Sequence, residues 1–201
     1  MEFLALLIIG VVLWYFFGRR SKKIDISILP SQFIVFDLET TGLRAESHEI
    51  IEIGAVRVNR DSKHHDTFQV LIKPNKKVPK KITEITGISQ QMVDRDGVPL
   101  DQAMTEFQTF IGDLRLVCYN AEFDMAFLHY AATKCGKKIT NPVSCALLMA
   151  RKAWPRRKSY RLTDIANVGG FSTAGAHRAL KDCELTITVY GAAATTLGRV
   201  E

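Results

Sequence analysis

FIVFDLETTGL, residues 33–43, begins as an almost unbroken apolar run and ends in residues typical of a turn. A short run of this kind predicts a strand that is buried on both faces of its sheet. Two acidic residues, Asp37 and Glu39, interrupt the run at alternate positions. Because residues two apart in a strand point to the same face, the two carboxylates should lie side by side.

Paired carboxylates on a buried strand repel each other and lose hydration, so the arrangement requires compensation. A divalent cation would supply it, since such ions bind through carboxylate oxygens. The alternative is that one of the two residues lies beyond the end of the strand and is simply solvated. Both interpretations are open from this stretch alone.

The rest of the chain after residue 30 predicts an α/β fold. Strands are indicated by apolar or β-branched runs over 50–58, 67–72 and 116–119. Apolar residues recur at helical spacing over 99–111, 121–135, 144–153 and 177–196. Strands first and helices interleaved later indicate a mixed sheet that is covered by helices.

Residues 3–17 form an unbroken apolar run of fifteen residues, and four cations follow within 19–23. Fifteen helical residues span about 22 Å, short of a hydrocarbon core of about 30 Å. A cleaved signal peptide or a buried core helix is the alternative, but the first carries its charge before the apolar run and the second usually has a polar face. We therefore expect a transmembrane anchor over 1–18, a basic linker over 19–30 and one domain over 31–201, inside the cell.

The charge balance points to an anionic partner. The chain has 27 Lys and Arg against 21 Asp and Glu, a formal net charge of +6, and all of these cations follow residue 18. A basic domain suits a polyanion or an anionic surface. The four cysteines form no CxxC pair and no zinc-ligand spacing, and the sequence has no GxxxxGK[ST] or GxGxxG motif. Disulfide scaffolds, structural zinc sites, P-loop enzymes and dinucleotide enzymes therefore lose their main support.

Further acidic residues lie near two predicted helix starts. Asp124 follows Asn120, which is placed to cap the next helix, although the helix dipole alone favours an acidic residue there. His177 and Asp182 are five apart, so on a regular helix their side chains would diverge by roughly 140°. His177 should therefore lie at or before the helix start, where Gly175 permits an irregular turn.

Three motifs carry most of the chemistry: FDLETTGL over 36–43, NAEFD over 120–124 and HRALKD over 177–182. Together they resemble the motifs of the DEDDh exonucleases, the group that includes the proofreading epsilon subunit of bacterial DNA polymerase III. EIIEIGAV over 49–56 and ITGIS over 85–89 are similar to further family segments. The resemblance covers the chain from about residue 31 onward. It implies a 3′–5′ exonuclease domain with a ribonuclease H-like fold, a mixed five-stranded sheet flanked by helices.

The resemblance also implies roles for particular residues. Two divalent ions, Mg²⁺ or Mn²⁺, would be held by four carboxylates: Asp37, Glu39, Asp124 and Asp182. His177 would be the general base, because an imidazole can take a proton from water at neutral pH. The terminal nucleotide would be bound by Thr40, Thr41, Gly42 and Leu43, in a pocket shaped by Asn120 and Phe123. The other histidines of polar, loop-like stretches, such as His48, are expected to be exposed.

Two basic tracts fit a nucleic acid substrate. Residues 151–161 place six cations in eleven residues with Trp154 and Tyr160 interleaved, and residues 73–81 place five lysines in nine. Cations on phosphates and aromatic rings on bases are typical of single-strand binding. A solvated surface explains either tract equally well, and a membrane surface is open for the lysines.

The sequence therefore predicts a metal-dependent enzyme that degrades single-stranded nucleic acid, DNA in preference to RNA, from its 3′ end to nucleoside 5′-monophosphates. Its partners would be those 3′ ends, the inner face of the plasma membrane, and a separate polymerase or repair protein. An anchor is not expected of a subunit embedded in a replicative polymerase, so repair, RNA trimming and turnover of small nucleic acids compete with proofreading. The alternative is a non-catalytic nucleic-acid-binding or scaffold protein on the same fold.

Overall fold

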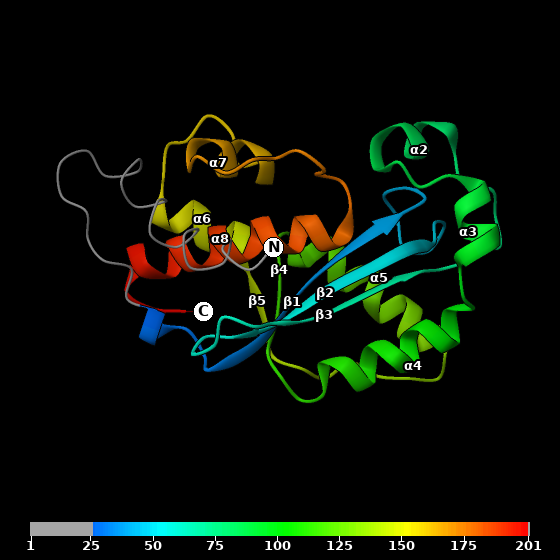
Figure 1. Cartoon of the computed structure of the whole chain (residues 1–201), viewed down its shortest axis with the longest axis horizontal. Helices are drawn as coiled ribbons and strands as arrows, with labels where there is room; N and C mark the ends of the chain where they lie inside the picture. Colours follow the sequence, from blue (N-terminus) through cyan, green and yellow to red (C-terminus); the bar gives the residue numbers. More distant parts are fainter. Residues whose placement is uncertain (1–25, 201) are drawn as a thin grey trace.

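The computed structural model describes residues 26–200, which form one five-stranded sheet with helices on both faces (Figure 1). The strand order is β3-β2-β1-β4-β5, so β1 lies in the middle of the sheet. The mixed five-stranded sheet flanked by helices, expected from the sequence, is confirmed.

The antiparallel half of the sheet consists of β1 (Gln32–Thr40), β2 (Ile50–Asn59) and β3 (Asp66–Leu71). Asp37 lies opposite Gly54, and Glu39 lies opposite Glu52. Directly opposed residues of an antiparallel pair point to the same face. These four positions therefore share one face of the sheet.

The parallel half consists of β4 (Leu116–Cys118), which pairs with β1, and β5 (Val143–Cys145), which pairs with β4. The sequence pattern predicts a helix from residue 144, and this is wrong for its first two residues. Ser144 and Cys145 complete β5, and α6 (Ala146–Ala153) begins after them. A strand of three residues is too short to show a period of its own, so the helical pattern that follows hides it.

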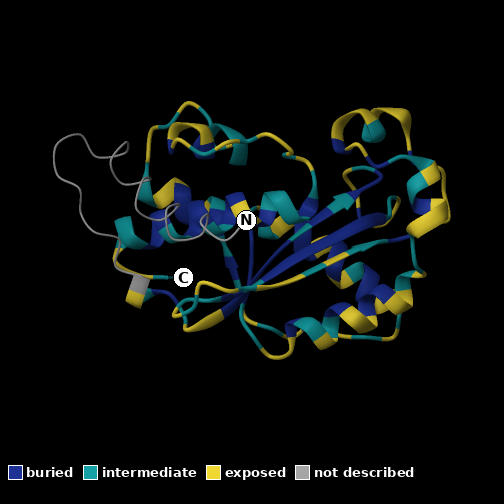
Figure 2. Ribbon diagram, in the orientation of Figure 1, coloured by how far each residue is buried: buried dark blue, intermediate teal, exposed yellow. Residues whose placement is uncertain are grey.

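Helices cover both faces of β1. Its even-numbered residues, such as Phe36, pack with α4 (Leu100–Ile111) and α5 (Ala121–Lys134) in one core cluster. Its odd-numbered residues, such as Phe33, pack with α6 and α8 (Ala179–Leu197) in a second cluster. β1 and β2 are accordingly buried between the two helical layers, whereas the edge strand β3 has exposed and half-buried residues (Figure 2). Asp37 and Glu39 continue the odd-numbered row, so they face α8.

Three short helices do not emerge from the sequence pattern. They are α2 (Lys80–Thr86), α3 (Gln90–Asp96) and α7 (Leu162–Val168), each of seven residues. Seven residues hold less than two full turns, too few for a clear apolar periodicity. In Figure 1, α2 and α3 lie at the end of the sheet where β1 ends, and α7 covers α8.

The predicted anchor, residues 1–18, and most of the predicted linker lie outside the described residues. Within 26–200, no helix combines the length and the apolar character that a membrane crossing requires. The end of the predicted linker contacts the domain: after the 3-10 turn η1 (Ile26–Ile28), Leu29 joins the core cluster beneath α8. Arg60 donates a hydrogen bond of 2.6 Å to the Leu29 carbonyl, which fixes this segment to the end of β2.

Candidate active site

The end of β1 carries two carboxylates toward the start of α8. The pairing of β1 with β2 shifts register between Glu39 and Thr40, so the regular strand stops directly after the second carboxylate. Asp37 and Glu39 are half-buried, whereas Phe33 and Val35 before them on the same face are buried. The carboxylates therefore keep access to solvent at one edge of an otherwise closed core.

The start of α8 supplies the third carboxylate and the histidine. The helix begins at Ala179, so His177 precedes it, as the five-residue spacing predicts. His177 has φ 65° and Gly175 has φ 81°, both in the left-handed region. The backbone N–H of His177 donates to both carboxylate oxygens of Asp182 at 3.3 Å. This turn places the exposed imidazole and the carboxylate at one helix end.

Three of the four predicted metal-binding carboxylates meet. Asp37, Glu39 and Asp182 each offer an oxygen, and these oxygens lie within 4.8 Å of one another. Hard divalent ions such as Mg²⁺ and Mn²⁺ take several oxygen ligands of this kind. The donor set therefore fits a divalent ion.

Asp124, the fourth predicted carboxylate, lies in the first turn of α5 and is 3% exposed. It is outside the group of three whose oxygens lie within 4.8 Å. Burial raises its pKa to about 7, although backbone hydrogen bonds from Asn120 and Leu38 to its carboxyl group oppose the rise, and its charge raises the pKa of Asp37. Because Leu38 stands between the two acidic residues of β1, this bond ties Asp124 to the same site.

Burial and mutual repulsion raise the pKa of all four carboxyl groups. For Asp37, burial is the largest cause, followed by the charges of Asp124 and Glu39. Burial and the Asp182 charge raise the pKa of Glu39 to about 8. Burial also raises the pKa of Asp124 and of Asp182, although backbone hydrogen bonds oppose it in both. A divalent cation relieves this concentration of negative charge, which supports the fit of the donor set.

The turn after β1 contains the predicted nucleotide-binding residues. Thr40 and Thr41 are buried, and their hydroxyls fix the turn: Thr40 Oγ1 donates to the Gly42 carbonyl at 2.6 Å, and Thr41 Oγ1 accepts from the Glu49 N–H at 2.9 Å. Leu43 is 82% exposed. The two threonines therefore shape the turn, and Leu43, four residues after Glu39, presents an apolar surface to solvent.

His48 contributes to this turn, although the sequence predicts an exposed side chain. Its ring packs against Gly42, where an added Cβ would lie only 2.2 Å from ring atom Cδ2. The side chain is half-buried as a result. The turn thus requires glycine at position 42 because of its close approach to His48.

Asn120 and Phe123 flank Asp124. Asn120 occupies the N-cap position of α5, but its exposed side chain makes no capping hydrogen bond within the described chain, contrary to the capping prediction. Phe123 is half-buried, and its ring centre lies 5.0 Å from that of Phe127. Both side chains therefore keep exposed surface beside the buried carboxylate.

The aromatic residues of the tract 151–161 are built into the fold. Trp154 and Tyr160 pack around Ile165 of α7, and the Tyr160 hydroxyl donates to the Trp154 carbonyl at 2.7 Å. The Arg151 guanidinium lies 5.8 Å from the centre of the Tyr160 ring. These half-buried rings hold the loop, and the cations make up most of its exposed surface.

One pair beside the site is not identified by the sequence analysis. Glu52, on β2, is completely buried and forms an ion pair with Arg178, which directly follows His177. A single glutamate within the apolar run IIEIGAV is the signal that could have indicated a buried, paired carboxylate.

Comparison with known proteins agrees with this geometry. Residues 34–190 match a protein-family model described as an exonuclease. The DNA polymerase III subunit epsilon of Aquifex aeolicus is 38% identical over 173 residues, which cover 85% of this chain and 84% of that protein. The chain belongs to the DEDD-type 3′–5′ exonuclease family.

Other relatives of this exonuclease are longer proteins. The PolC-type DNA polymerase III of Clostridium perfringens is 37% identical over 159 residues, which cover 79% of this chain but only 11% of that protein. Among solved structures, Escherichia coli exonuclease I bound to single-stranded DNA superimposes with a TM-score of 0.73, at 19% identity, over 84% of this chain and 41% of that one. At that identity the likeness shows the fold, which is the ribonuclease H-like exonuclease fold expected from the sequence.

Proposed function

We propose that this exonuclease uses two divalent metal ions, Mg²⁺ or Mn²⁺, to hydrolyse single-stranded nucleic acid into nucleoside 5′-monophosphates. The observation that carries the proposal is the convergence of Asp37, Glu39 and Asp182, whose oxygens lie within 4.8 Å of one another. The Asp124 carboxyl group accepts a hydrogen bond from the Leu38 backbone, and the His177 backbone N–H donates to Asp182, so both residues lie beside this group. The proposal therefore assigns all five positions expected from the sequence to one site.

The carboxylates would hold the ions. When bound, two divalent ions stabilise the attacking and the leaving oxygens of a phosphoryl displacement. Asp37, Glu39 and Asp182 offer the converging oxygens, and buried Asp124 extends the negative charge on the α5 side. Since burial raises the pKa of each group, the carboxylates lose their protons most completely when a cation is present.

His177 is suited to accept a proton. Its side chain is exposed, while its backbone is fixed by the hydrogen bonds from its N–H to the Asp182 carboxylate. A neutral imidazole in this position can take a proton from the attacking water. Because its backbone is bonded to Asp182, the base and the carboxylate keep a fixed relation.

DNA is the preferred polymer in this proposal. The relatives are described as subunits or forms of DNA polymerase III, and the similar solved structures include exonuclease I bound to single-stranded DNA. The 3′ end would enter past Leu43, with the turn 40–43 and the half-buried Phe123 around the terminal nucleotide. The cations of the tract 151–161 are available to more distant phosphates.

The proposal includes a membrane anchor over residues 1–18, with the domain in the cytoplasm. The apolar run of fifteen residues is followed by four cations, and such cations remain on the cytoplasmic side. A polymerase or a repair protein would then be a separate partner chain. Fractionation of cells that express the full-length chain tests this part: recovery in the soluble fraction with an intact N-terminus would contradict it.

The catalytic proposal is tested with purified full-length chain and 5′-labelled single-stranded DNA and RNA of matched sequence. With Mg²⁺ or Mn²⁺, products should shorten from the 3′ end one nucleotide at a time, and faster for DNA. With a chelator, the products should not form. Binding of either polymer without cleavage in metal would contradict the proposal and favour a non-catalytic nucleic-acid-binding protein.

A further inference from the structure

Glu52 lies next to the candidate metal ligands, but its carboxylate accepts hydrogen bonds from other parts of the protein. It is on β2, directly opposite Glu39, and its side chain has no exposed surface. A buried carboxylate is strongly unfavourable unless it is paired and hydrogen-bonded. The partners of Glu52 therefore indicate why the chain places a charge there.

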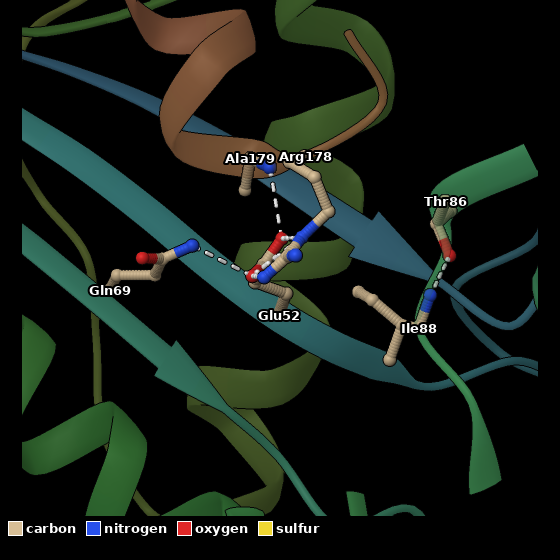
Figure 3. Close-up of polar contacts among 6 residues, drawn as sticks. All are labelled: Glu52, Gln69, Thr86, Ile88, Arg178 and Ala179. Atoms are coloured by element: carbon tan, nitrogen blue, oxygen red, sulfur yellow. Dashed lines mark hydrogen bonds and ion pairs between the residues drawn. The ribbon is translucent and has the colours of Figure 1, made fainter. Parts of the chain in front are cut away.

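Donors reach the Glu52 carboxylate from two sides (Figure 3). From β3, Gln69 Nε2 donates at 2.9 Å. From the start of α8, Arg178 Nη2 donates at 2.7 Å and the Ala179 backbone N–H donates at 2.9 Å. Arg178 Nε lies 3.3 Å from both oxygens. Most of these bonds therefore join β2 to the first residues of one helix.

The bonds from α8 make Glu52 an external cap of that helix. Arg178 occupies the N-cap position, and its side chain makes no capping hydrogen bond within residues 26–200. Ala179, the first helical residue, has one of the N–H groups that a helix leaves unsatisfied at its start. Glu52 satisfies this N–H, and its negative charge is favoured at the positive end of the helix dipole.

Gly54 allows the same helix end to lie directly on β2. A Cβ at this position would lie 2.5 Å from the Leu180 backbone nitrogen and 2.6 Å from the Ala179 carbonyl carbon. The thiol of Cys183 also donates to the Gly54 carbonyl at 3.3 Å. Since Gly54 is the cross-strand partner of Asp37, the contact that carries α8 is adjacent to a candidate metal ligand.

We propose that Glu52 and Arg178 are positioning residues for hydrolysis. Arg178 directly follows His177, and Asp182 donates its backbone N–H to the Arg178 carbonyl at 3.0 Å. The ion pair thus fixes the turn that presents His177 and Asp182 to the two carboxylates of β1. This inference rests on the proposed function, because it assigns the pair to the same reaction.

The central experiment compares the full-length parent with Glu52→Gln, which retains the shape of the side chain but removes its charge. Using the labelled DNA substrate, kcat should fall by about 10- to 100-fold, as is typical when a partner that orients metal ligands is lost. The Mn²⁺ concentration for half-maximal activity should rise, while KM for the oligonucleotide stays within about threefold, because the substrate contacts are unchanged.

Three further variants separate positioning from folding. Gln69→Met removes a 2.9 Å bond to the same carboxylate from the β3 side but leaves the contacts with α8, so it should lower stability while changing the Mn²⁺ requirement of the folded chain less than Glu52→Gln does. Arg178→Lys retains a charge without the fork of donors, and should recover part of the activity that Arg178→Met loses. Because Arg178→Lys keeps a positive charge beside the buried Glu52 carboxylate, it tests the proposal even if Glu52→Gln or Arg178→Met does not fold.

The readouts distinguish this inference from a merely structural role. A smaller folded fraction would lower kcat, leave the Mn²⁺ requirement unchanged and be reversed at lower temperature. An unchanged Mn²⁺ requirement and kcat in folded Glu52→Gln and in Arg178→Met would overturn the inference. A parent without metal-dependent cleavage would instead overturn the proposed function, so the two failures are separable.

Discussion

Glu39 and Glu52 face each other across the β1–β2 pair, but they lie in opposite electrostatic surroundings. Glu52 receives hydrogen bonds from Gln69, Arg178 and Ala179. Glu39 is surrounded mainly by other carboxylates, and burial together with the charges of Asp182 and Glu52 raises its pKa to about 8. The protein itself thus stabilises the charged form of Glu52, whereas the charged form of Glu39 would be stabilised by a bound cation.

The difference shows how one pair of strands holds both a structural and a reactive carboxylate. The partners of Glu52 come from β3 and α8 and occupy its oxygens. Glu39 lies at the bulge that ends β1, where its carboxylate retains access to solvent. A ligand can therefore reach Glu39, whereas the oxygens of Glu52 are already bound.

Removal of a reactive carboxylate should give the largest effect. Asp37→Ala is expected to lower metal-dependent hydrolysis by about 10³-fold or more, because it removes one of the three carboxylates that would bind the metal ions. The rate of shortening of labelled single-stranded DNA measures this effect. Circular dichroism should show a folded chain. Activity within tenfold of the parent would show that the three-carboxylate group is not the site.

Removal of the Glu52 carboxylate should reduce stability as well as activity. Glu52→Ala leaves Arg178 and the Ala179 N–H without their acceptor, so the free energy of unfolding should fall by about 3 kcal/mol. Urea unfolding of the full-length chain at pH 7 measures it. Glu49→Ala is the matched control, since this half-exposed carboxylate holds Asn75 and Lys76 at the surface and should contribute about 1 kcal/mol. An equal loss of unfolding free energy in Glu52→Ala and Glu49→Ala would show that the buried ion pair contributes no more than a surface carboxylate.

Metal binding should stabilise the reactive group, and more so at high pH. At a Mn²⁺ concentration of 100 times its Kd, the folded state should gain about 2.7 kcal/mol. Protons compete with the ion, and the Glu39 pKa is about 8, so the metal-induced rise in Tm should be larger at pH 8 than at pH 6. Thermal unfolding with Mn²⁺ or chelator checks this. Asp37→Asn should lose most of the rise, and an equal rise at both pH values would contradict the prediction.

The sequence predicts the reactive half of this comparison better than the structural half. The alternation of Asp37 and Glu39 places both on one face of a buried strand, and the five-residue spacing of His177 and Asp182 places the histidine before the helix. Both inferences concern neighbours along the chain. Glu52 takes its role from Arg178, 126 residues away, and that pairing depends on where α8 packs on the sheet.

In the fold as well, the sequence pattern reveals local features better than those that depend on distant contacts. The long strands β1 and β2 and the longer helices show clear periods, so their positions follow from the sequence. The three-residue strand β5 and the seven-residue helix α7 are too short for this, and they form because β4 and α8 provide surfaces to pack on. Tertiary contacts determine these elements.

The smallest effect should have the opposite sign to the loss at Glu52. In chelator, Glu39→Gln should raise the free energy of unfolding by about 1 kcal/mol at pH 8, after allowance for solvent screening of a half-buried group. The pKa of Glu39 rises from an ordinary 4.5 to about 8 on folding, so its ionisation penalises the folded state. That penalty is absent below pH 4.5, grows as the pH rises from 4.5 to about 8, and is complete above pH 8.

The gain from Glu39→Gln should therefore be near zero close to pH 4.5 and increase steadily toward pH 8. Urea unfolding of parent and variant at pH 5, 6.5 and 8 measures it, with Glu52→Gln as the contrasting variant that loses stability at every pH. The gain should vanish when Mn²⁺ is added at pH 8, because the ion then stabilises the parent carboxylate. A loss of stability at pH 8 in chelator would show that Glu39, like Glu52, is already satisfied by the protein.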